Sequence, residues 1–174
     1  MSGPGARPGA KAGAAAKPGA KAGTRPPARV ARCDDDAPPT AEQIPLPEAV
    51  AERPFEEKSP AEWAYERLIL YIQNFEEQLD NAHEVAMGFT GGDVGVLRIE
   101  GLGYFDPDIV TFYGSDGEGA KTQLIQHVSQ LNVMLRALPR EDVSEAPPNR
   151  IGFRLAADLG KEAGAGGRET RDKG

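Results

Sequence analysis

Apolar positions spaced alternately four and three residues apart predict a long helix near residue 60. The repeating residues are Ala61, Tyr65, Leu68, Ile72, Phe75, Leu79 and Ala82, a spacing typical of one helix face. The helix is expected to begin at Ser59-Pro60-Ala61-Glu62, a capping box with proline at the first helical position. Trp63, Leu70 and Tyr71 widen the apolar surface, so we expect part of this helix to stay open for a partner.

Alternating apolar and polar positions predict strands after this helix. Three strands are expected at residues 85–89, 94–100 and 109–113, with a hairpin turn at 90–93 and a loop at 101–108. A second helix is then predicted from the four-and-three spacing of Leu124, Val128, Leu131, Leu135 and Leu138, ended by Pro139. Residues 150–155 are expected to form a last strand. The order α-β-β-β-α-β predicts an α+β fold, a mostly antiparallel sheet with two helices on one face.

Composition limits the predicted globular domain to residues 59–157. Residues 1–32 carry seven basic side chains, no acidic one, and nothing large to bury. Residues 33–58 are acidic and proline-rich, and their apolar patch at 44–47 is expected either to stay in a solvated linker or to dock on the core. We expect residues 1–58 and 158–174 to be disordered. A domain of about 100 residues has one modest core, which disfavours a deep substrate cavity.

Several kinds of site are excluded by the residues present. Cys33 is the only cysteine, so neither an internal disulfide nor a thiolate metal cluster can form. His83 and His127 are the only histidines, and no nucleotide-binding motif is present, so we expect no metal and no cofactor. Neither a signal peptide nor an apolar run long enough for a bilayer is visible, and we expect a cytoplasmic protein without membrane contact.

Three sequence blocks together resemble a known family. They are SPAEWAYER at 59–67, PDIVTFYG at 107–114 and QLIQHVSQL at 123–131, followed by RIGF at 150–153. In order and spacing they resemble a bacterial family, found mainly in alphaproteobacteria, that is known only as domain of unknown function 6173. The resemblance covers about residues 59–155. It implies a single compact domain in a bacterial cytoplasm, and it implies no activity, cofactor or catalytic residue.

The leading hypothesis for function is a non-catalytic module that binds a protein partner or a second copy of itself. The predicted anchors are Trp63, Leu70 and Tyr71, because buried aromatic and aliphatic side chains supply the core of protein interfaces. The wide apolar surface of the first helix motivates this hypothesis, together with the lack of a catalytic motif.

Two alternatives remain open. A small enzyme would use His127 with a nearby carboxylate, Asp106 or Asp108; on the predicted helix Ser129 faces away from His127, so no triad is expected. Alternatively, the basic N-terminal arm would bind nucleic acid weakly and without sequence preference, by neutralising phosphates. The arm residues are Lys11, Lys17, Lys21, Arg25 and Arg29. The whole chain has a net charge of −7 although this arm is basic. The remaining residues are therefore acidic and would compete with nucleic acid for the arm.

Overall fold

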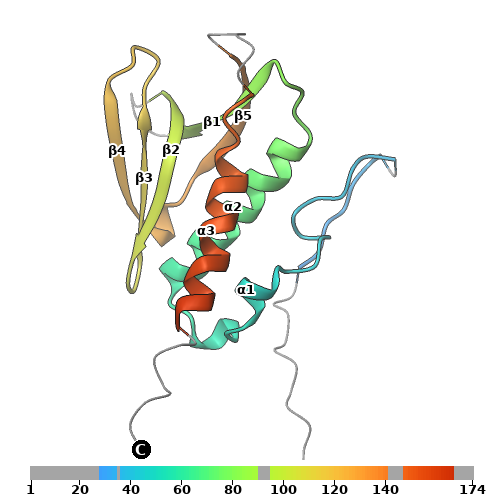
Figure 1. The fold of residues 1–174 in the computed structure, drawn as a ribbon, viewed down its shortest axis with the longest axis vertical. Helices are drawn as coiled ribbons and strands as arrows, with labels where there is room; N and C mark the ends of the chain where they lie inside the picture. Colours follow the sequence, from blue (N-terminus) through green and yellow to red (C-terminus); the bar gives the residue numbers. More distant parts are fainter. Residues whose placement is uncertain (1–27, 35, 90–94, 141–146, 167–174) are drawn as a thin grey trace, which may run out of the picture.

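The computed structural model describes residues 28–34, 36–89, 95–140 and 147–166, with side chains up to residue 161 (Figure 1). The long elements are helix α2 (Pro60–Glu77), strands β1 (His83–Phe89), β2 (Val96–Phe105), β3 (Ile109–Ser115), β4 (Lys121–His127) and β5 (Val133–Pro139), and helix α3 (Ile151–Gly166). Three short elements are α1 (Glu48–Ala51), η1 (Phe55–Glu57) and η2 (Val128–Gln130). Within the described ranges, no helix is long and apolar enough to cross a membrane.

The five strands form one antiparallel sheet in the order β4-β3-β2-β1-β5. β1 pairs with β5 along its whole length, whereas in the described residues it pairs with β2 at Met87↔Leu97 and Gly88↔Val96. The β2–β3 register shifts between Ile99 and Gly101, and an irregularity of this kind bends a strand. The β4–β3–β2 part and the β1–β5 part accordingly lie at an angle to each other beside the helices (Figure 1).

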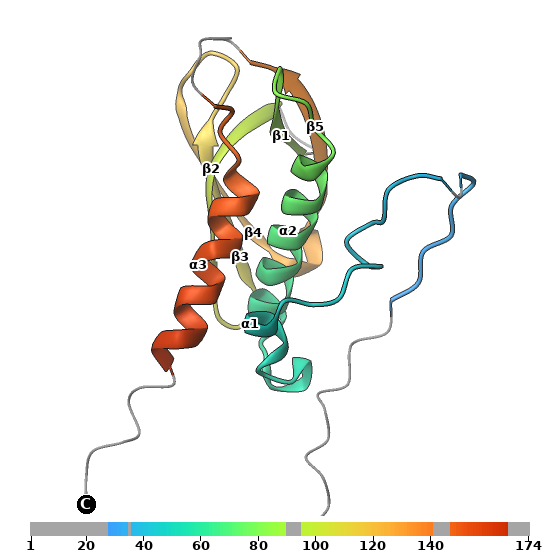
Figure 2. The ribbon, with the colours of Figure 1, turned by 45° about the vertical axis from the view of Figure 1, so that its right-hand side comes forward.

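The core lies between this curved sheet and the helices α2 and α3, which run side by side on one face (Figure 2). Its fully buried large side chains include Ile69 and Ile72 of α2, Met87 of β1, Leu97 of β2, and Val110 and Phe112 of β3. Helix α3 adds Ile151 and Leu155. The predicted α+β fold, an antiparallel sheet with two helices on one face, is therefore confirmed.

The predicted start of the first helix is also confirmed. Ser59 Oγ accepts a hydrogen bond from the backbone N–H of Glu62 at 3.0 Å, and Pro60 occupies the first helical position. This bond satisfies an N–H that has no partner inside the helix. The strands predicted at 85–89 and 109–113 are present with slightly wider bounds, and the predicted turn at 90–93 lies outside the described residues.

The prediction of a helix over residues 124–138 is wrong. This stretch forms β4, the single turn η2 and β5. Leu124, Val128, Leu131 and Leu135 do pack against the core, but Val133 packs there as well. Val133 and Leu135 have the spacing of two that is typical of a strand, whereas Val128 and Leu131 belong to the turn between the strands. Pairing of β4 with β3 and of β5 with β1 decided in favour of strands. Residues 101–105, predicted as loop, extend β2.

The prediction of a strand over residues 150–155 is also wrong, because Ile151 begins helix α3. Ile151, Leu155 and Leu159 pack against the core at a spacing of four, while Phe153 is 43% exposed. Helix α3 continues to Gly166, beyond the predicted domain end at Ala157. The second helix of the fold therefore combines the residues predicted as the last strand with residues 158–166 of the predicted C-terminal tail.

Residues 36–58 pack on the fold, which agrees with the alternative in which their apolar patch at 44–47 docks on the core. Ala41 and Val50 are buried, and the segment contains α1 and η1. Lys58 Nζ contacts both carboxylate oxygens of Glu66 at 2.6 and 2.8 Å and the carbonyl oxygen of Val50 at 2.7 Å. The Lys58 side chain is only 3% exposed. This segment therefore packs along α2 as part of the fold.

Candidate functional site

The three predicted partner anchors lie on different surfaces of α2. Trp63 is half-buried, and the guanidinium carbon of Arg67 lies 4.4 Å from the centre of its ring. Leu70 lines a hollow shared with Ala41, Ile44, Pro45 and Pro47 of the N-terminal segment. Tyr71, 40% exposed, lines a different cavity. The apolar patch at 44–47 therefore docks on α2 and faces the surface that the sequence predicted to be open around Leu70.

The cavity beside Tyr71 lies between α2 and β5, and we call it the α2–β5 groove. Its volume is about 310 Å³, and it is lined by Leu68, Tyr71, Ile72, Leu131, Val133 and Leu135. The lining is aliphatic except for Tyr71, whose hydroxyl donates a hydrogen bond to Glu42. Burial and the Glu42 carboxylate together raise the pKa of Tyr71 to about 12, and the same hydrogen bond lowers the pKa of Glu42. One rim of the groove is thus fixed by the N-terminal segment.

Two ion pairs and an amide hold that segment beside the groove. Asn74 Nδ2 donates to the carbonyl oxygen of Pro39 at 3.0 Å. Arg53 contacts both oxygens of Glu62, at 2.7 and 3.0 Å, and Lys58 pairs with Glu66 one turn later. Burial is the main cause that raises the pKa of Glu66, and the hydrogen bond from Lys58 acts against it. The segment and α2 therefore form one surface around the groove.

His127, the predicted catalytic candidate, lies at the end of β4 between two polar side chains. Its Nε2 is 2.9 Å from Asp108 Oδ2, and its Nδ1 is 2.8 Å from Ser129 Oγ. The backbone N–H of Ser129 also points at Nδ1, at 3.2 Å. Because a backbone N–H can only donate, Nδ1 accepts and Nε2 carries the proton toward Asp108. Asp108, His127 and Ser129 thus form a hydrogen-bonded chain that runs from a carboxylate through an imidazole to a hydroxyl.

The expectation that Ser129 faces away from His127 is wrong, since these residues lie at a strand end and in a 3-10 turn, not on an α-helix. Asp108 reaches His127 because β3 and β4 pair in the register Ile109↔His127. The signal in the sequence was the glycine-rich turn at 116–120 between two alternating runs, which predicts this hairpin. Asp106, the other predicted carboxylate, instead accepts a hydrogen bond from Ser59.

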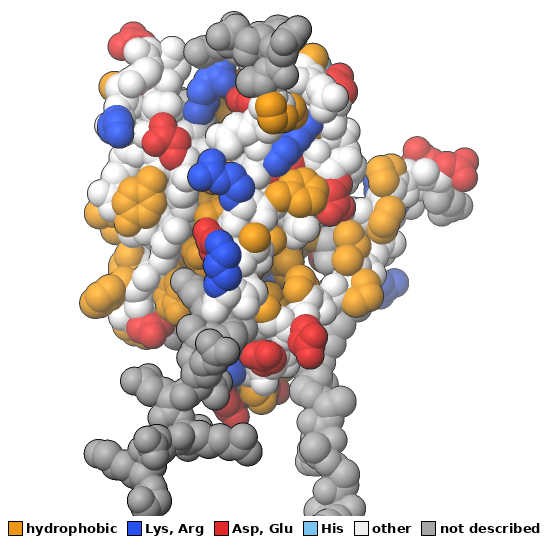
Figure 3. Space-filling model, viewed as in Figure 1, with side chains coloured by type: hydrophobic (Ala, Val, Ile, Leu, Met, Phe, Trp, Pro, Cys, Tyr) orange, Lys and Arg blue, Asp and Glu red, His pale blue; other side chains and the backbone are white. Residues whose placement is uncertain are grey.

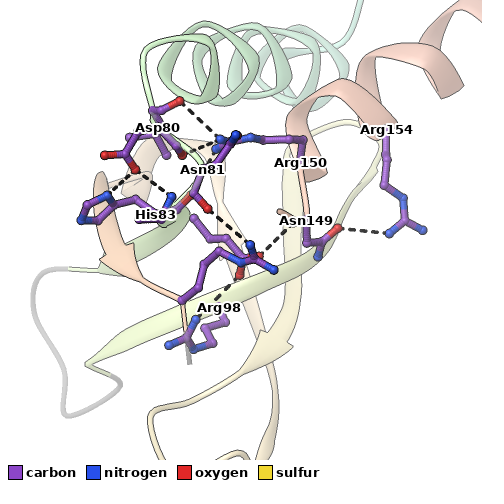
Figure 4. Close-up of polar contacts among 11 residues, drawn as sticks. Asp80, Asn81, His83, Arg98, Asn149, Arg150 and Arg154 are labelled. Atoms are coloured by element: carbon purple, nitrogen blue, oxygen red, sulfur yellow. Dashed lines mark hydrogen bonds and ion pairs between the residues drawn. The ribbon is translucent and has the colours of Figure 1, made fainter. Parts of the chain in front are cut away.

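A group of arginines gathers where α2 ends and α3 begins (Figure 4). Arg150 donates to the carbonyl oxygens of Leu79, Asp80 and His83 at 3.3, 2.7 and 3.3 Å. Arg140 Nε lies 3.5 Å from Glu84, and Arg98 lies 4.0 Å from the same carboxylate. Basic side chains also follow the course of α3 on the face shown in Figure 3. These contacts tie α2, β1, β2, β5 and α3 together, so the group has a structural role.

The structure gives no contacts or distances that test the other predicted sites. Lys11, Lys17, Lys21 and Arg25 lie outside the described residues, and Arg29 is exposed, so the nucleic-acid arm stays a prediction. Cys33 is exposed. In the described ranges, no group of three or more His, Cys, Asp or Glu side chains lies close enough together to hold a metal ion.

Comparison with known proteins gives a family and no activity. The model of the family described as "Family of unknown function (DUF6173)" matches residues 56–154, from η1 into α3. The matched segment contains all six residues that line the α2–β5 groove and the three residues of the Asp108–His127–Ser129 chain. No curated protein and no solved structure matches the chain. As the match covers more than half of its length, the chain belongs to the family of unknown function DUF6173.

Proposed function

We propose that this domain is a protein-binding module that holds an extended peptide segment against the outer edge of β5. The observation that supports this proposal is the α2–β5 groove, an aliphatic cavity directly beside an edge strand. An extended segment paired with β5 would send every second side chain toward α2 and into the groove. Backbone hydrogen bonds would supply part of the affinity, and the groove would select apolar side chains.

The burial pattern of β5 fits this geometry. Val133 and Leu135 are half-buried and point toward the groove, whereas Met134 and Arg136 are exposed on the opposite face. In the sheet order, β5 has a strand neighbour only on the β1 side, among the described strands. An edge strand keeps backbone N–H and C=O groups available for pairing. The strand edge and the groove therefore offer the two kinds of contact that peptide recognition by strand addition needs.

The predicted anchors enter this proposal in different ways. Tyr71 lines the groove and can contact a bound side chain directly. Leu70 holds the N-terminal segment, and Trp63 stacks with Arg67, so neither is placed in the groove. The proposal therefore keeps the interaction hypothesis but moves its centre to Leu68, Ile72, Leu131, Val133 and Leu135.

The test is selection from a displayed library of random linear peptides on the full-length chain. We expect enriched peptides with apolar residues at alternate positions, and slower amide hydrogen exchange in β5 when a selected peptide is bound. Val133→Lys and Leu131→Lys are each expected to weaken binding at least about tenfold. Phe153→Lys, at an exposed residue of α3, is the matched control and should bind like the unchanged chain.

Circular dichroism verifies that each variant is folded. Enriched peptides without alternation, or with unchanged exchange in β5, would argue against strand addition. Selection of no peptide at all, or binding that survives both lysine variants, would contradict the groove as the binding site.

A second candidate function is ester or amide hydrolysis by Ser129, supported by its contact with His127. Ser129 Oγ would attack a carbonyl carbon while its proton passes to His127 Nδ1, and Asp108 would hold the Nε2 proton. That proton would then go to the departing alcohol or amine as its bond to the carbonyl carbon breaks, and water would release the acid from Ser129 in the same way. This candidate ranks second because the His127 and Asp108 side chains are 47% and 39% exposed, and neither cavity described above includes them. The Nδ1 contact with the backbone N–H of Ser129 is also an ordinary cap of η2.

Hydrolysis of p-nitrophenyl acetate and butyrate tests this second candidate. Activity should fall at least about a hundredfold in Ser129→Ala and in His127→Ala, because a positioned base contributes roughly that much or more. Ser115→Ala is the control. Hydrolysis that is equal in the unchanged chain and in both variants would exclude Ser129 as a nucleophile for these esters.

A further inference from the structure

The sheet face that points away from the helices carries a continuous surface on β2, β3 and β4, which we call the outer face. Its residues alternate with the core residues Val110, Phe112 and Leu124. Cross-strand register joins them into rows, such as Gly103–Thr111–Ile125. The outer face consists of Gly101, Gly103, Phe105, Ile109, Thr111, Tyr113, Gln123, Ile125 and His127.

Large apolar side chains are exposed on the outer face. Phe105 is 75% exposed, Ile125 is 62% exposed and Tyr113 is 42% exposed. Phe105, Ile109 and His127 lie in one cross-strand row, so the apolar side chains of Phe105 and Ile109 are neighbours. Single exposed apolar residues are common on proteins, but a contiguous group on one sheet face marks an interaction surface.

Charge is missing from the outer face although it is frequent elsewhere in the chain. Asp, Glu, Lys and Arg make up 27% of all residues, yet none of them belongs to the outer face. Charged side chains lie at its two ends. Arg98 and Lys121 form the next row with Ser115, and Glu100 is exposed beside Gly101. At the other end Asp108 is bound to His127. Depletion of charge with enrichment of aromatic residues is the composition found in the core of protein interfaces.

The acidic character of the domain indicates which partner fits this face. Residues 59–157 contain fifteen acidic and seven basic side chains, so two copies repel each other in most orientations. Contact through the outer face limits that repulsion, because its centre carries no acidic side chain and Asp108 and Glu100 lie near its opposite ends. A basic partner would gain more on the acidic parts of the surface. We propose that two copies of this chain associate through their outer faces around a twofold axis.

The shape of the outer face suits such an arrangement. At one end Phe105 projects, and at the other Gly101 and Gly103 leave the backbone low under the ring of Tyr113. A Cβ atom on Gly103 would lie 2.8 Å from Thr111 Oγ1 and 3.6 Å from the Tyr113 ring, so these two side chains already fill the space over Gly103. A twofold axis that runs across the strands in the plane of the interface, near Thr111, places Phe105 of each copy against the exposed Tyr113 ring of the other, which is the self-complementary contact that twofold symmetry requires.

The experiment is sedimentation equilibrium of the full-length chain over a wide concentration range. We expect a mass of two chains, and dimer dissociation constants raised at least about tenfold in Phe105→Glu and in Ile125→Glu. Phe153→Glu, a similarly apolar and exposed position on α3, is the matched control and should remain dimeric. The two glutamate variants are independent, and circular dichroism shows which of them is folded.

A second readout uses crosslinking. In a Cys33→Ser background, Thr111→Cys should be joined to a second copy by a short bis-maleimide, because Thr111 lies near the axis. A mass of one chain at all concentrations would overturn the proposal, and so would a dimer that survives both Phe105→Glu and Ile125→Glu. This inference does not depend on the α2–β5 groove, and Val133→Lys should leave the dimer unchanged.

Discussion

The pair Lys58–Glu66 offers a direct test of whether residues 36–58 are an integral part of the fold. The Lys58 side chain is 3% exposed and that of Glu66 is 12% exposed, with Nζ 2.6 Å from Oε2. Lys58→Met keeps most of the side-chain volume but leaves the Glu66 carboxylate and the Val50 carbonyl oxygen without this partner. Breaking one side of a buried ion pair costs about 3–5 kcal/mol of the free energy of unfolding. That is a large fraction of the roughly 5–15 kcal/mol of a typical domain.

The assay is urea and thermal unfolding followed by circular dichroism. For a domain of this size, a loss of about 3–5 kcal/mol lowers the melting temperature by roughly 10–20 °C. The double variant Lys58→Met/Glu66→Leu removes both charges and should recover most of the loss, because paired apolar side chains replace buried ion pairs at little cost. Arg53→Met is the matched control, since Arg53 is 54% exposed in its pair with Glu62. Its expected cost is at most about 1 kcal/mol.

The pH dependence of Lys58→Met follows from the raised pKa of Glu66. Burial already favours the protonated carboxyl in the native chain, and loss of Lys58 removes the contact that opposes this effect. The destabilisation should therefore be greatest near neutral pH and shrink as pH falls toward the ordinary value of 4.5. If Lys58→Met lowers the free energy of unfolding no more than Arg53→Met does, both at neutral pH and near pH 4.5, the buried pair is refuted, and with it the packing of residues 36–58 on α2.

Two further predictions concern the contact between α2 and α3. Gly152→Ala would place a Cβ atom 2.6 Å from the Gln73 backbone nitrogen, so urea unfolding should show a loss of about 1–3 kcal/mol, whereas Gly160→Ala has open space and should lose none. Burial raises the pKa of Glu76, whose Oε2 accepts from the Gly152 N–H at 2.8 Å. As pH rises above 4.5, the Glu76 carboxyl therefore loses its proton in the unfolded chain before it does so in the folded chain, and the free energy of unfolding should fall with rising pH. Glu76→Gln should flatten that slope in urea titrations between pH 4 and 7; an unchanged slope would contradict a raised pKa for Glu76.

The first half of the domain was predictable because its signals are local. The capping box at 59–62 and the regular spacing from Ala61 to Leu79 predict α2 without reference to the rest of the chain. The second half was not, since its apolar spacing fits both a helix and strands. Leu131 and Leu135 are four apart, as on a helix, but Val133 between them also packs against the core. Only the pairing of β5 with β1 shows that this stretch is a strand and not a helix.

The candidate sites show the same division. His127 was singled out from the sequence, but its contacts with Asp108 and Ser129 depend on the β3–β4 register and on the turn η2. The α2–β5 groove was not predicted, because Leu131, Val133 and Leu135, which form half of its lining, were expected on a second helix and not beside or in an edge strand. The outer face was missed for a related reason: β4 was expected to be helical, so no row of residues across three strands could be proposed.

By itself, the sequence determined that the chain forms an α+β domain, where α2 begins, and which face of α2 turns to the core. These features follow from local hydrogen bonding at a helix start and from hydrophobicity, which each residue carries into any fold. Tertiary structure alone decided that residues 124–138 are strands, that α3 is the second helix, and that residues 36–58 pack on α2. Those outcomes depend on contacts between residues far apart in the chain. The pairing of β5 with β1 and the hydrogen bond from Asn74 to Pro39 are such contacts, and each stabilises a structure that local preference leaves undecided.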